Sequence, residues 1–554
     1  MQQDARSIPV VIDGRTHKVV NNDQKMAGGG LEGAEKLSRE MLSWQPAIIS
    51  PDQQIAADKE MADARTSDAV QNIGMMRGAS ATHKDSIVGA VYRLNAKPNV
   101  EALLGYGATD EWADEFQVAV ESRFNLIADS PNNWLDASRM NTLTSMVRLA
   151  IGVYFVHGEV LATAEWIKDP RRPCRTAIQM VSPFRLSNPQ GEADNATLRS
   201  GVRIDPTYGA PLGYYIKSTY PGEIFNMENA WIWKYVPATK PWGRKQVIHI
   251  LEQMNPSQSR GISEMVSVLK DMRMTKRFSE ITLQNAVVNA SYAAVVESDL
   301  PSDMIYASMG AGQSLDGATP MAGMLGEYLT AMNSYLASAK NIAVDGVKMP
   351  HLFPGTKLNL KPMGTPGGVG TEFEASLLRH IATGLGLSYE QLSRDYSQTN
   401  YSSARATMAE TWKFMMSRKK MVADRFATEV YTLWLEEEIQ AGTLPLPGNM
   451  TPDEFYKPIV KEAISACDWI GASRGQIDEG KETDAAIKRM NSNLSTLEME
   501  SARLGTDWRD NLKQIAREQK MRKRLGIDPP PADPSKPAAQ TATDEQDKQK
   551  EDEQ

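Results

Sequence analysis

Cysteine and histidine are scarce in this chain of 554 residues. The two cysteines, Cys174 and Cys467, stand far apart and form no CxxC pair, and no two of the six histidines lie three to five residues apart. This pattern argues against a disulfide-stapled secreted domain and against a zinc site with the usual ligand spacing. We therefore predict no metal site and no cofactor, and a protein made in the reducing cytoplasm.

Long apolar runs are also missing. The most apolar stretch, Ala150–Val156, contains Gly152 and stops at His157, whereas a membrane-spanning helix needs about 20 apolar residues. The first residues include no basic stretch followed by an apolar run, so we expect no signal peptide. The sequence predicts no association with a membrane.

The chain also lacks an excess of positive charge. Lys and Arg number 61 against 69 Asp and Glu, which gives a net charge of −8. Proteins that hold DNA by its backbone are usually basic, because their affinity comes from neutralising phosphates. Either DNA is not a partner, or DNA must pass this protein without adhering to it.

Enzyme motifs are almost absent as well. Gly475–Lys481 is close to a phosphate-binding loop, but Glu482 occupies the Ser/Thr position that would ligate magnesium, and no apolar strand precedes it. This favours a turn between helices over nucleotide binding. His249, near Glu252, could serve as a base, although a structural histidine is the favoured interpretation. We predict no catalytic residue, with a cytosolic hydrolase using His249 as a minor alternative.

Apolar periodicity and breaker residues divide the remaining sequence into helical and β-rich parts. Trp112, Phe116, Val120 and Phe124 recur every four residues, which predicts an amphipathic helix over Trp112–Ile127. A second helix is expected over Asp136–Ala150. Between residues 153 and 251, short apolar runs alternate with Gly, Pro, Asn and Asp, which indicates a β-rich module.

Several long helices follow. Gly261–Val296 and Met321–Ala339 have few breakers and flank a Gly- and Ser-rich insertion, Leu300–Thr319. A shorter helix is expected over Phe373–Thr383. The helix that starts at Ser402 would extend roughly 55–60 Å if it continued to residue 440. Helices of this length need tertiary or intersubunit packing, since propensity alone does not sustain them.

The two ends of the chain differ from the middle. Residues 1–73 include a Gly28-Gly29-Gly30 run and are predicted to form a mostly flexible arm. From residue 528 onward there is no large apolar side chain, so we expect a disordered, mostly acidic tail. A basic cluster precedes the tail, and we interpret it as a solvated helix end favoured by the helix dipole, with phosphate contact as the alternative. The cluster comprises Arg517, Lys520, Arg522, Lys523 and Arg524.

Three stretches resemble the lambda-type portal family of tailed bacteriophages. The first joins Val247-Ile248-His249 to residues 255–263, NPSQSRGIS. The second and most specific runs from Ile381 to Arg405, IATGLGLSYEQLSRDY followed by TNYSSAR. The third begins at Trp469 with WIGASRG. Weaker likeness extends from about residue 74 to about residue 520.

This resemblance implies an α+β portal-protein fold with an α/β wing, paired long stem helices, a clip insertion and a helical crown, assembled as a ring of twelve subunits. Mapped onto this sequence, the family plan gives nine regions. They are a flexible arm (1–73), a wing with the β-rich module (74–255), a first stem helix (256–297), a clip (298–320), a second stem helix (321–345), a wing return (346–386), a tunnel-loop region (387–401), a long helix and crown (402–527) and a disordered tail (528–554).

The resemblance also implies a function. Such a ring forms the channel for double-stranded DNA during packaging and ejection, and it docks the terminase large subunit, a head–tail connector protein and the major capsid protein. It would be found at the capsid vertex of the virion, and in the host cytoplasm during assembly. A neutral or acidic wall suits DNA that must slide. From loop position we take Arg394, Gln398, Asn400 and Tyr401 as candidates for contact with DNA in the channel. The alternative within the same setting is another virion structural or adaptor protein.

Overall fold

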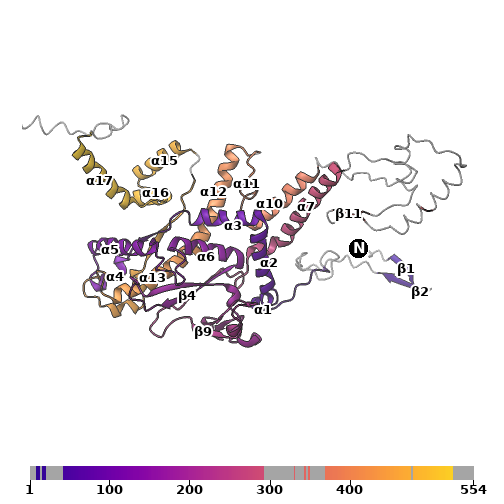
Figure 1. Ribbon diagram of the computed structural model, residues 1–554, viewed down its shortest axis with the longest axis horizontal. Coiled ribbons are helices and arrows are strands. Elements are labelled where there is room, and N and C mark those ends of the chain that lie inside the picture. The colour runs from indigo at the N-terminus through magenta and orange to yellow at the C-terminus, as the bar shows by residue number, and fades with distance from the viewer. Residues whose placement is uncertain are drawn as a thin grey trace, which may run out of the picture.

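The computed structural model describes residues 8–12, 15–19, 42–291, 330, 342–344, 347–349, 369–397, 399–475 and 478–527. Helices and sheets are mixed in one body, with a helical layer above the strands (Figure 1). Two helices, α7 and α10, project from one side of this body, and α15–α17 lie above its other side. None of the described helices is long and apolar enough to cross a membrane.

The body begins earlier than the sequence suggested. Helices α1 (Pro51–Ala56) and α2 (Lys59–Asn72) are folded, and α2 packs on α3 (Gly74–Ile87) and α6 (Leu143–His157). The prediction of a flexible arm through residue 73 is therefore wrong for these helices. The buried side chains of α2 include Lys59 and Asp63, which pair with each other at 2.9 Å. Charged residues are almost never buried unless they are paired. The sequence does not show which residues will pair, so it did not indicate that Lys59 and Asp63 are buried.

The helical layer consists of α3, α5 (Asp110–Ala128) and α6. The helix predicted over Trp112–Ile127 is confirmed as α5, whose Phe116, Val120 and Phe124 are fully buried. The second helix was predicted from Asp136 but begins at Leu143. Asp136 is instead a buried loop carboxylate that accepts hydrogen bonds from the Ser138 and Asn141 backbone.

Two antiparallel sheets form the β-rich module that the sequence predicted. One has the strand order β10-β4-β5, with β4 paired to both neighbours. The other has the order β6-β7-β8-β9 and its own small apolar cluster. The strands are β4 (Glu159–Trp166), β5 (Thr176–Val181), β6 (Leu198–Arg199), β7 (Val202–Ile204), β8 (Pro211–Lys217), β9 (Trp233–Pro237) and β10 (Val247–Leu251).

Three strand pairs complete the described sheets. The pair β3–β13 joins segments far apart in the sequence, and β1–β2 and β11–β12 are hairpins. Their bounds are β1 (Ile8–Ile12), β2 (Arg15–Val19), β3 (Arg93–Ala96), β11 (Ile342–Val344), β12 (Val347–Met349) and β13 (Cys467–Ile470).

Helices α7 (Leu269–Ser291) and α10 (Val369–Gly384) pack side by side (Figure 1). The region predicted as a first stem helix from residue 256 becomes α-helical only at Leu269, because residues 256–263 form a loop that is hydrogen-bonded into the body. The clip (298–320) and Met321–Ala339 lie outside the described residues. The segment 321–345 was predicted as a second stem helix, but its residues 342–344 form strand β11.

The long helix predicted from Ser402 to residue 440 is confirmed. It consists of α12 (Tyr401–Arg418), a π-helical segment (Lys419–Asp424) and α13 (Arg425–Gln440). Tyr431 and Trp434 of α13 are fully buried and pack edge-on against Phe124 of α5. This aromatic contact anchors the long helix in the core.

The C-terminal part forms three polar helices, α15 (Glu479–Asn491), α16 (Leu497–Arg503) and α17 (Trp508–Leu525). Ion pairs such as Lys97–Glu498 at 2.8 Å connect them to the body. The acidic tail from residue 528 lies outside the described residues. Three short helices are α4 (Val100–Leu103), α11 (Tyr389–Ser393) and α14 (Val460–Ile464).

Candidate functional site

The most specific sequence motif folds into a short connection between α10 and α12. Gly386 turns the chain with φ +66°, and a Cβ there would collide with the ring of Phe414. Ser388 then caps α11 through a capping box with Gln391. The predicted loop therefore contains a helix, and the Gly-Leu-Ser motif is explained by a tight turn followed by a helix N-cap.

Two adjacent residues of α3 hold the first part of this connection, at Leu385 and at Arg394. His83 Nε2 lies 3.1 Å from the carbonyl oxygen of Leu385, and Arg394 Nη2 donates to Thr82 Oγ1 at 3.0 Å. A carbonyl can only accept, so His83 is the donor in its bond. We call residues 385–394 the anchored segment. The chain beyond it, toward α12, has no such attachment to α3 among the described residues, and Asp395, Tyr396 and Ser397 are exposed.

The four candidates for DNA contact occupy different positions around this connection. Arg394 is exposed and ends α11 in the left-handed conformation, with φ 60°. Asn400 is the exposed N-cap of α12, and its side-chain oxygen accepts from the Ser403 backbone at 2.8 Å. Tyr401 is the first residue of α12. Gln398 lies outside the described residues. Three of the four thus lie within eight positions of one another in the sequence.

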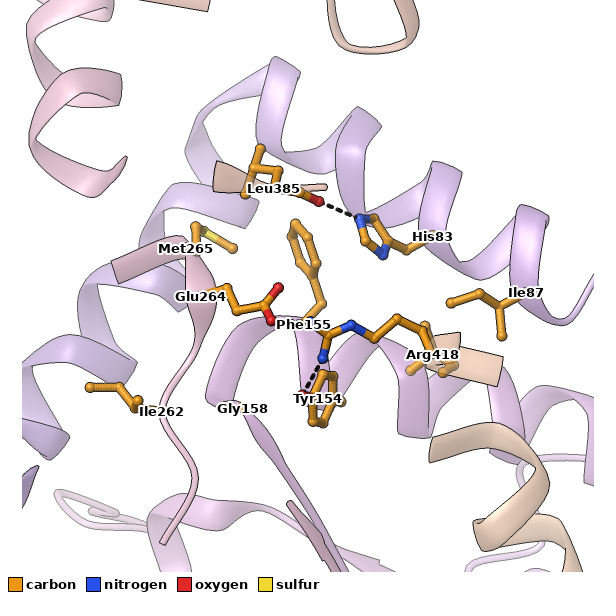
Figure 2. Close-up of a pocket in the computed structure, with 11 residues that line it drawn as sticks. His83, Ile87, Tyr154, Phe155, Gly158, Ile262, Glu264, Met265, Leu385 and Arg418 are labelled. Carbon is orange, nitrogen blue, oxygen red and sulfur yellow. Dashed lines mark hydrogen bonds and ion pairs between the residues drawn. The ribbon is translucent and has the colours of Figure 1, made fainter. Parts of the chain in front are cut away.

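A small cavity of about 20 Å³ lies beside Leu385, the first residue of the anchored segment (Figure 2). Figure 2 shows that His83 from α3 and Arg418 from the end of α12 both line the cavity. A cavity of this size holds about one water molecule, so it offers no room for a substrate. The cavity lies at a junction of elements, between α3, α6, the end of α12 and the residues just before α7.

Arg418 ties the long helix to the elements around this cavity. Its guanidinium pairs with Glu252 at 2.9 Å and with Glu264, and it lies over the ring of Tyr154. The Arg418 residue is only 8% exposed, whereas the side chains of Glu252 and Glu264 are 53% and 46% exposed, so these ion pairs lie at the surface end of the junction. Burial lowers the pKa of His83 to about 4, and the charge of Arg418 adds to this effect. His83 is therefore neutral at physiological pH.

A second group of buried charges lies where α2, β4, β10 and the loop before α7 meet. Glu159 is fully buried and lies 2.7 Å from Arg260, 3.2 Å from Lys59 and 3.1 Å from His249. Burial alone would raise the pKa of Glu159, but Arg260, Lys59 and His249 outweigh it and hold that pKa well below its usual range. We call these four residues the Glu159 cluster.

The Glu159 cluster explains part of the first sequence motif. The Gly261 backbone N–H also donates to Glu159 at 2.9 Å, and a Cβ on Gly261 would collide with the carbonyl of Gly158. Arg260 and Gly261 are therefore required together, one for its charge and the other for its small size. His249 is a partner of this buried carboxylate, which supports the structural interpretation over the catalytic one.

The near match to a phosphate-binding loop folds as the start of a helix. Asp478 is the N-cap of α15 and pairs with Lys481 at 2.8 Å, so a carboxylate sits where a phosphate would have to bind. Within the described ranges, no group of three or more His, Cys, Asp or Glu residues is arranged to hold a metal ion.

Sequence reasoning missed Thr82, His83, Arg418 and Glu159. Each acts through a partner far away in the chain, as His83 does with Leu385, 302 residues later. The one signal in the sequence was the Arg260-Gly261 pair in the first motif. It indicated that these two residues have a specific role, but it did not identify Glu159 as their partner.

Comparison with known proteins identifies the class of this chain. The portal protein of Escherichia phage N15 is 36% identical over 505 residues, covering 91% of each chain. Portal protein B of Escherichia phage lambda is 36% identical over 499 residues, covering 90% of each. Among solved structures, the chain is similar to one in the neck of an empty gene transfer agent particle, with 11% identity, a TM-score of 0.37, and coverage of 86% of this chain and 100% of the other. The two phage relatives place the chain among phage portal proteins.

The family can be stated more narrowly. The model of the phage portal protein, lambda family, matches residues 37–419. The chain belongs to the lambda family of phage portal proteins, and its function is that of a portal. This confirms the resemblance drawn from the three motifs and favours a portal over a different virion protein.

Proposed function

We propose that twelve copies of this chain form a non-enzymatic ring at the capsid vertex, and that the connection between α11 and α12 lines its DNA channel. In this assembly α7 and the segment after it form the stem and clip, the β-rich module belongs to the wing, and α15–α17 form the crown. The ring would assemble in the host cytoplasm and dock the terminase large subunit, the major capsid protein and a head–tail connector protein.

One observation carries the channel assignment. The anchored segment is fixed to α3 at Leu385 and Arg394, while Asp395, Tyr396 and Ser397 are exposed. A segment that is rigidly positioned at its base and exposed beyond it can present side chains to passing DNA at a constant height in every subunit. Functional side chains are commonly found on loops that a rigid scaffold positions.

The local chemistry suits sliding better than gripping. Asp395 adds a negative charge beside Arg394, and engagement of the Asn400 oxygen in a helix cap leaves its amide N–H₂ for transient contacts. A few polar contacts can be broken and remade as DNA moves, whereas a dense row of cations would hold each phosphate. Arg394 donates to Thr82, so we expect it to position the segment as well as to contact DNA.

The test replaces Gln398, Asn400 and Tyr401 with alanine, singly and together, in the full chain. We expect rings to assemble normally and DNA packaging or retention to fall, most in the triple variant. The matched control replaces the exposed Gln190, Asn226 and Tyr208 of the wing with alanine. Packaging and retention equal to those of the unsubstituted ring would contradict the channel assignment.

Ring formation is measured separately. Twelve chains of 61.2 kDa each give about 734 kDa, which mass measurement of the purified protein and end-on imaging would detect. A closed oligomer without a central hole would contradict the proposed conduit.

A further inference from the structure

Helix α17 has a charge opposite to that of the rest of the chain. It contains seven Lys or Arg and two Asp or Glu, a net charge of +5, while the whole chain is at −8. The other residues therefore sum to −13. A helix this basic in an acidic chain needs a specific explanation.

The cations of α17 gather on one side. Arg509, Lys513, Arg517, Lys520 and Arg524 are separated by steps of four, four, three and four residues, and such steps place side chains on one helix face. We call these five residues the basic stripe. At 1.5 Å per residue the stripe is about 22 Å long. All of its members except Arg509 are exposed, and α17 has no buried residue.

Among the described residues, ion pairs involve only the first part of the stripe. Arg509 pairs with Asp114 at 2.9 Å, and Lys513 lies 3.9 Å from Asp510. In the part of the chain that the structure describes, Arg517, Lys520 and Arg524 form no ion pair. Arg517, Lys520 and Arg524 therefore present three charges to solvent without an ion-pair partner among the described residues, on a helix that lies apart from the sheets in Figure 1.

The helix dipole does not account for this pattern. Cations in the last turn, here Arg522, Lys523 and Arg524, are favoured by the negative end of the helix. That effect fades beyond the last turn, so it gives no reason for Arg517 and Lys520. It also gives no reason for a stripe, since the last-turn cations need not share a face.

We propose that the basic stripe of α17 binds the phosphate backbone of double-stranded DNA, at a site separate from the channel segment. This inference rests on the portal function. Duplex DNA carries one negative charge for about every 1.7 Å of its length, so a straight row of cations about 22 Å long can neutralise several phosphates at once. The stripe offers Lys and Arg without a pattern that reads base edges, so binding is independent of sequence.

The test measures duplex binding by assembled rings as a function of salt. The variant R517Q/K520Q/R524Q removes the three unpaired cations, and glutamine keeps the helix propensity. The control K168Q/R203Q/K234Q removes the same charge from exposed residues of the wing. We expect binding about tenfold weaker or more in the α17 variant at about 0.1 M salt, and a salt slope lower by about 0.9 for each phosphate that is no longer neutralised. The control should match the unsubstituted ring.

Equal weakening of DNA binding in both variants would show only a long-range effect of net charge. Unchanged DNA binding in both variants would show that the stripe does not bind DNA. Either result overturns the proposal. Residues 528–554 contain eight acidic and three basic residues and are the competing occupant. If the stripe binds residues 528–554 instead of DNA, the α17 substitutions will change DNA binding only in a chain truncated after Ile527. That result also overturns the proposal. Failure of the unsubstituted ring to package DNA would count against the portal function itself, whereas normal packaging with unchanged binding would count against the stripe alone.

Discussion

Charged side chains are arranged in opposite ways in the body and in α17. In the body, Glu159 is fully buried and meets three cationic or titratable partners within 3.2 Å. In α17, Arg517, Lys520 and Arg524 are exposed and have no ion-pair partner among the described residues. Buried charges must be paired because desolvation is costly, whereas exposed charges lose little free energy when unpaired and stay available to a partner. Burial therefore decides whether a charge stabilises the fold through its partners or stays available to a partner outside the chain.

Substitution of Glu159 should have the largest effect. Glu159→Gln leaves Arg260 and Lys59 buried without the carboxylate, and we expect a loss of about 3–5 kcal/mol in the free energy of unfolding. Urea unfolding of the purified chain measures this. The exposed Glu192 offers a control, since Glu192→Gln should change the free energy by less than about 0.5 kcal/mol. Similar values for the two variants would break the contrast between buried and exposed charges.

The neutral His83 makes the stability of the body depend on pH. Its pKa is about 4 in the folded chain and about 6.5 when unfolded. Between these values the unfolded chain binds more protons, so stability is complete above pH 6.5 and falls as the pH drops toward 4. From pH 7 to pH 5 this contribution is about 2 kcal/mol.

His83→Gln should abolish that part of the pH dependence, because glutamine can still donate to Leu385 but does not titrate in this range. His380 is the matched control: its side chain is 67% exposed and lies 2.9 Å from Asp271. Unfolding of each variant is compared at pH 7 and pH 5. An unchanged pH dependence in His83→Gln would contradict the assignment of His83 as a buried neutral donor.

The smallest effect is expected at the contact between the body and α17. Arg93 and Asp510 lie 3.4 Å apart, with side chains 45% and 57% exposed. A double-mutant cycle with Arg93→Gln and Asp510→Asn should give a coupling of about 0.5 kcal/mol. Added salt should reduce it further. A coupling as large as that of a buried pair would mean that α17 is held to the body more firmly than its exposure indicates.

Local patterns in the sequence were enough for several elements. The four-residue spacing of Phe116, Val120 and Phe124 predicted α5, because an amphipathic helix repeats its apolar face every 3.6 residues. The long helix through α12 and α13 followed from the same periodicity. The start of α6 was placed at Asp136, seven residues too early, because Asp136 accepts hydrogen bonds from its own loop and the helix begins only after its N-cap Thr142. Residue spacing alone does not show which aspartate organises a loop.

The anchored segment shows more clearly what could not be predicted from the sequence. Its motif could be recognised from residues 381–405, and the capping box at Ser388 is local. Its attachment to Thr82 and His83 could not be predicted, since these contacts span about 300 residues. The same holds for α2, whose Lys59 and Asp63 look like surface residues until β4 supplies Glu159.

By itself the sequence determined the family, through the resemblance of three motifs, and it determined the kinds of element and the acidic balance of the chain, because these two depend on short-range periodicity and on composition. Only the tertiary structure decided which charges are buried and paired, which segment is fixed to α3, and which cations of α17 remain without a partner. The physical reason is that the free energy of a charge depends on its solvation and on partners brought close by folding, and neither is encoded within a few residues of it.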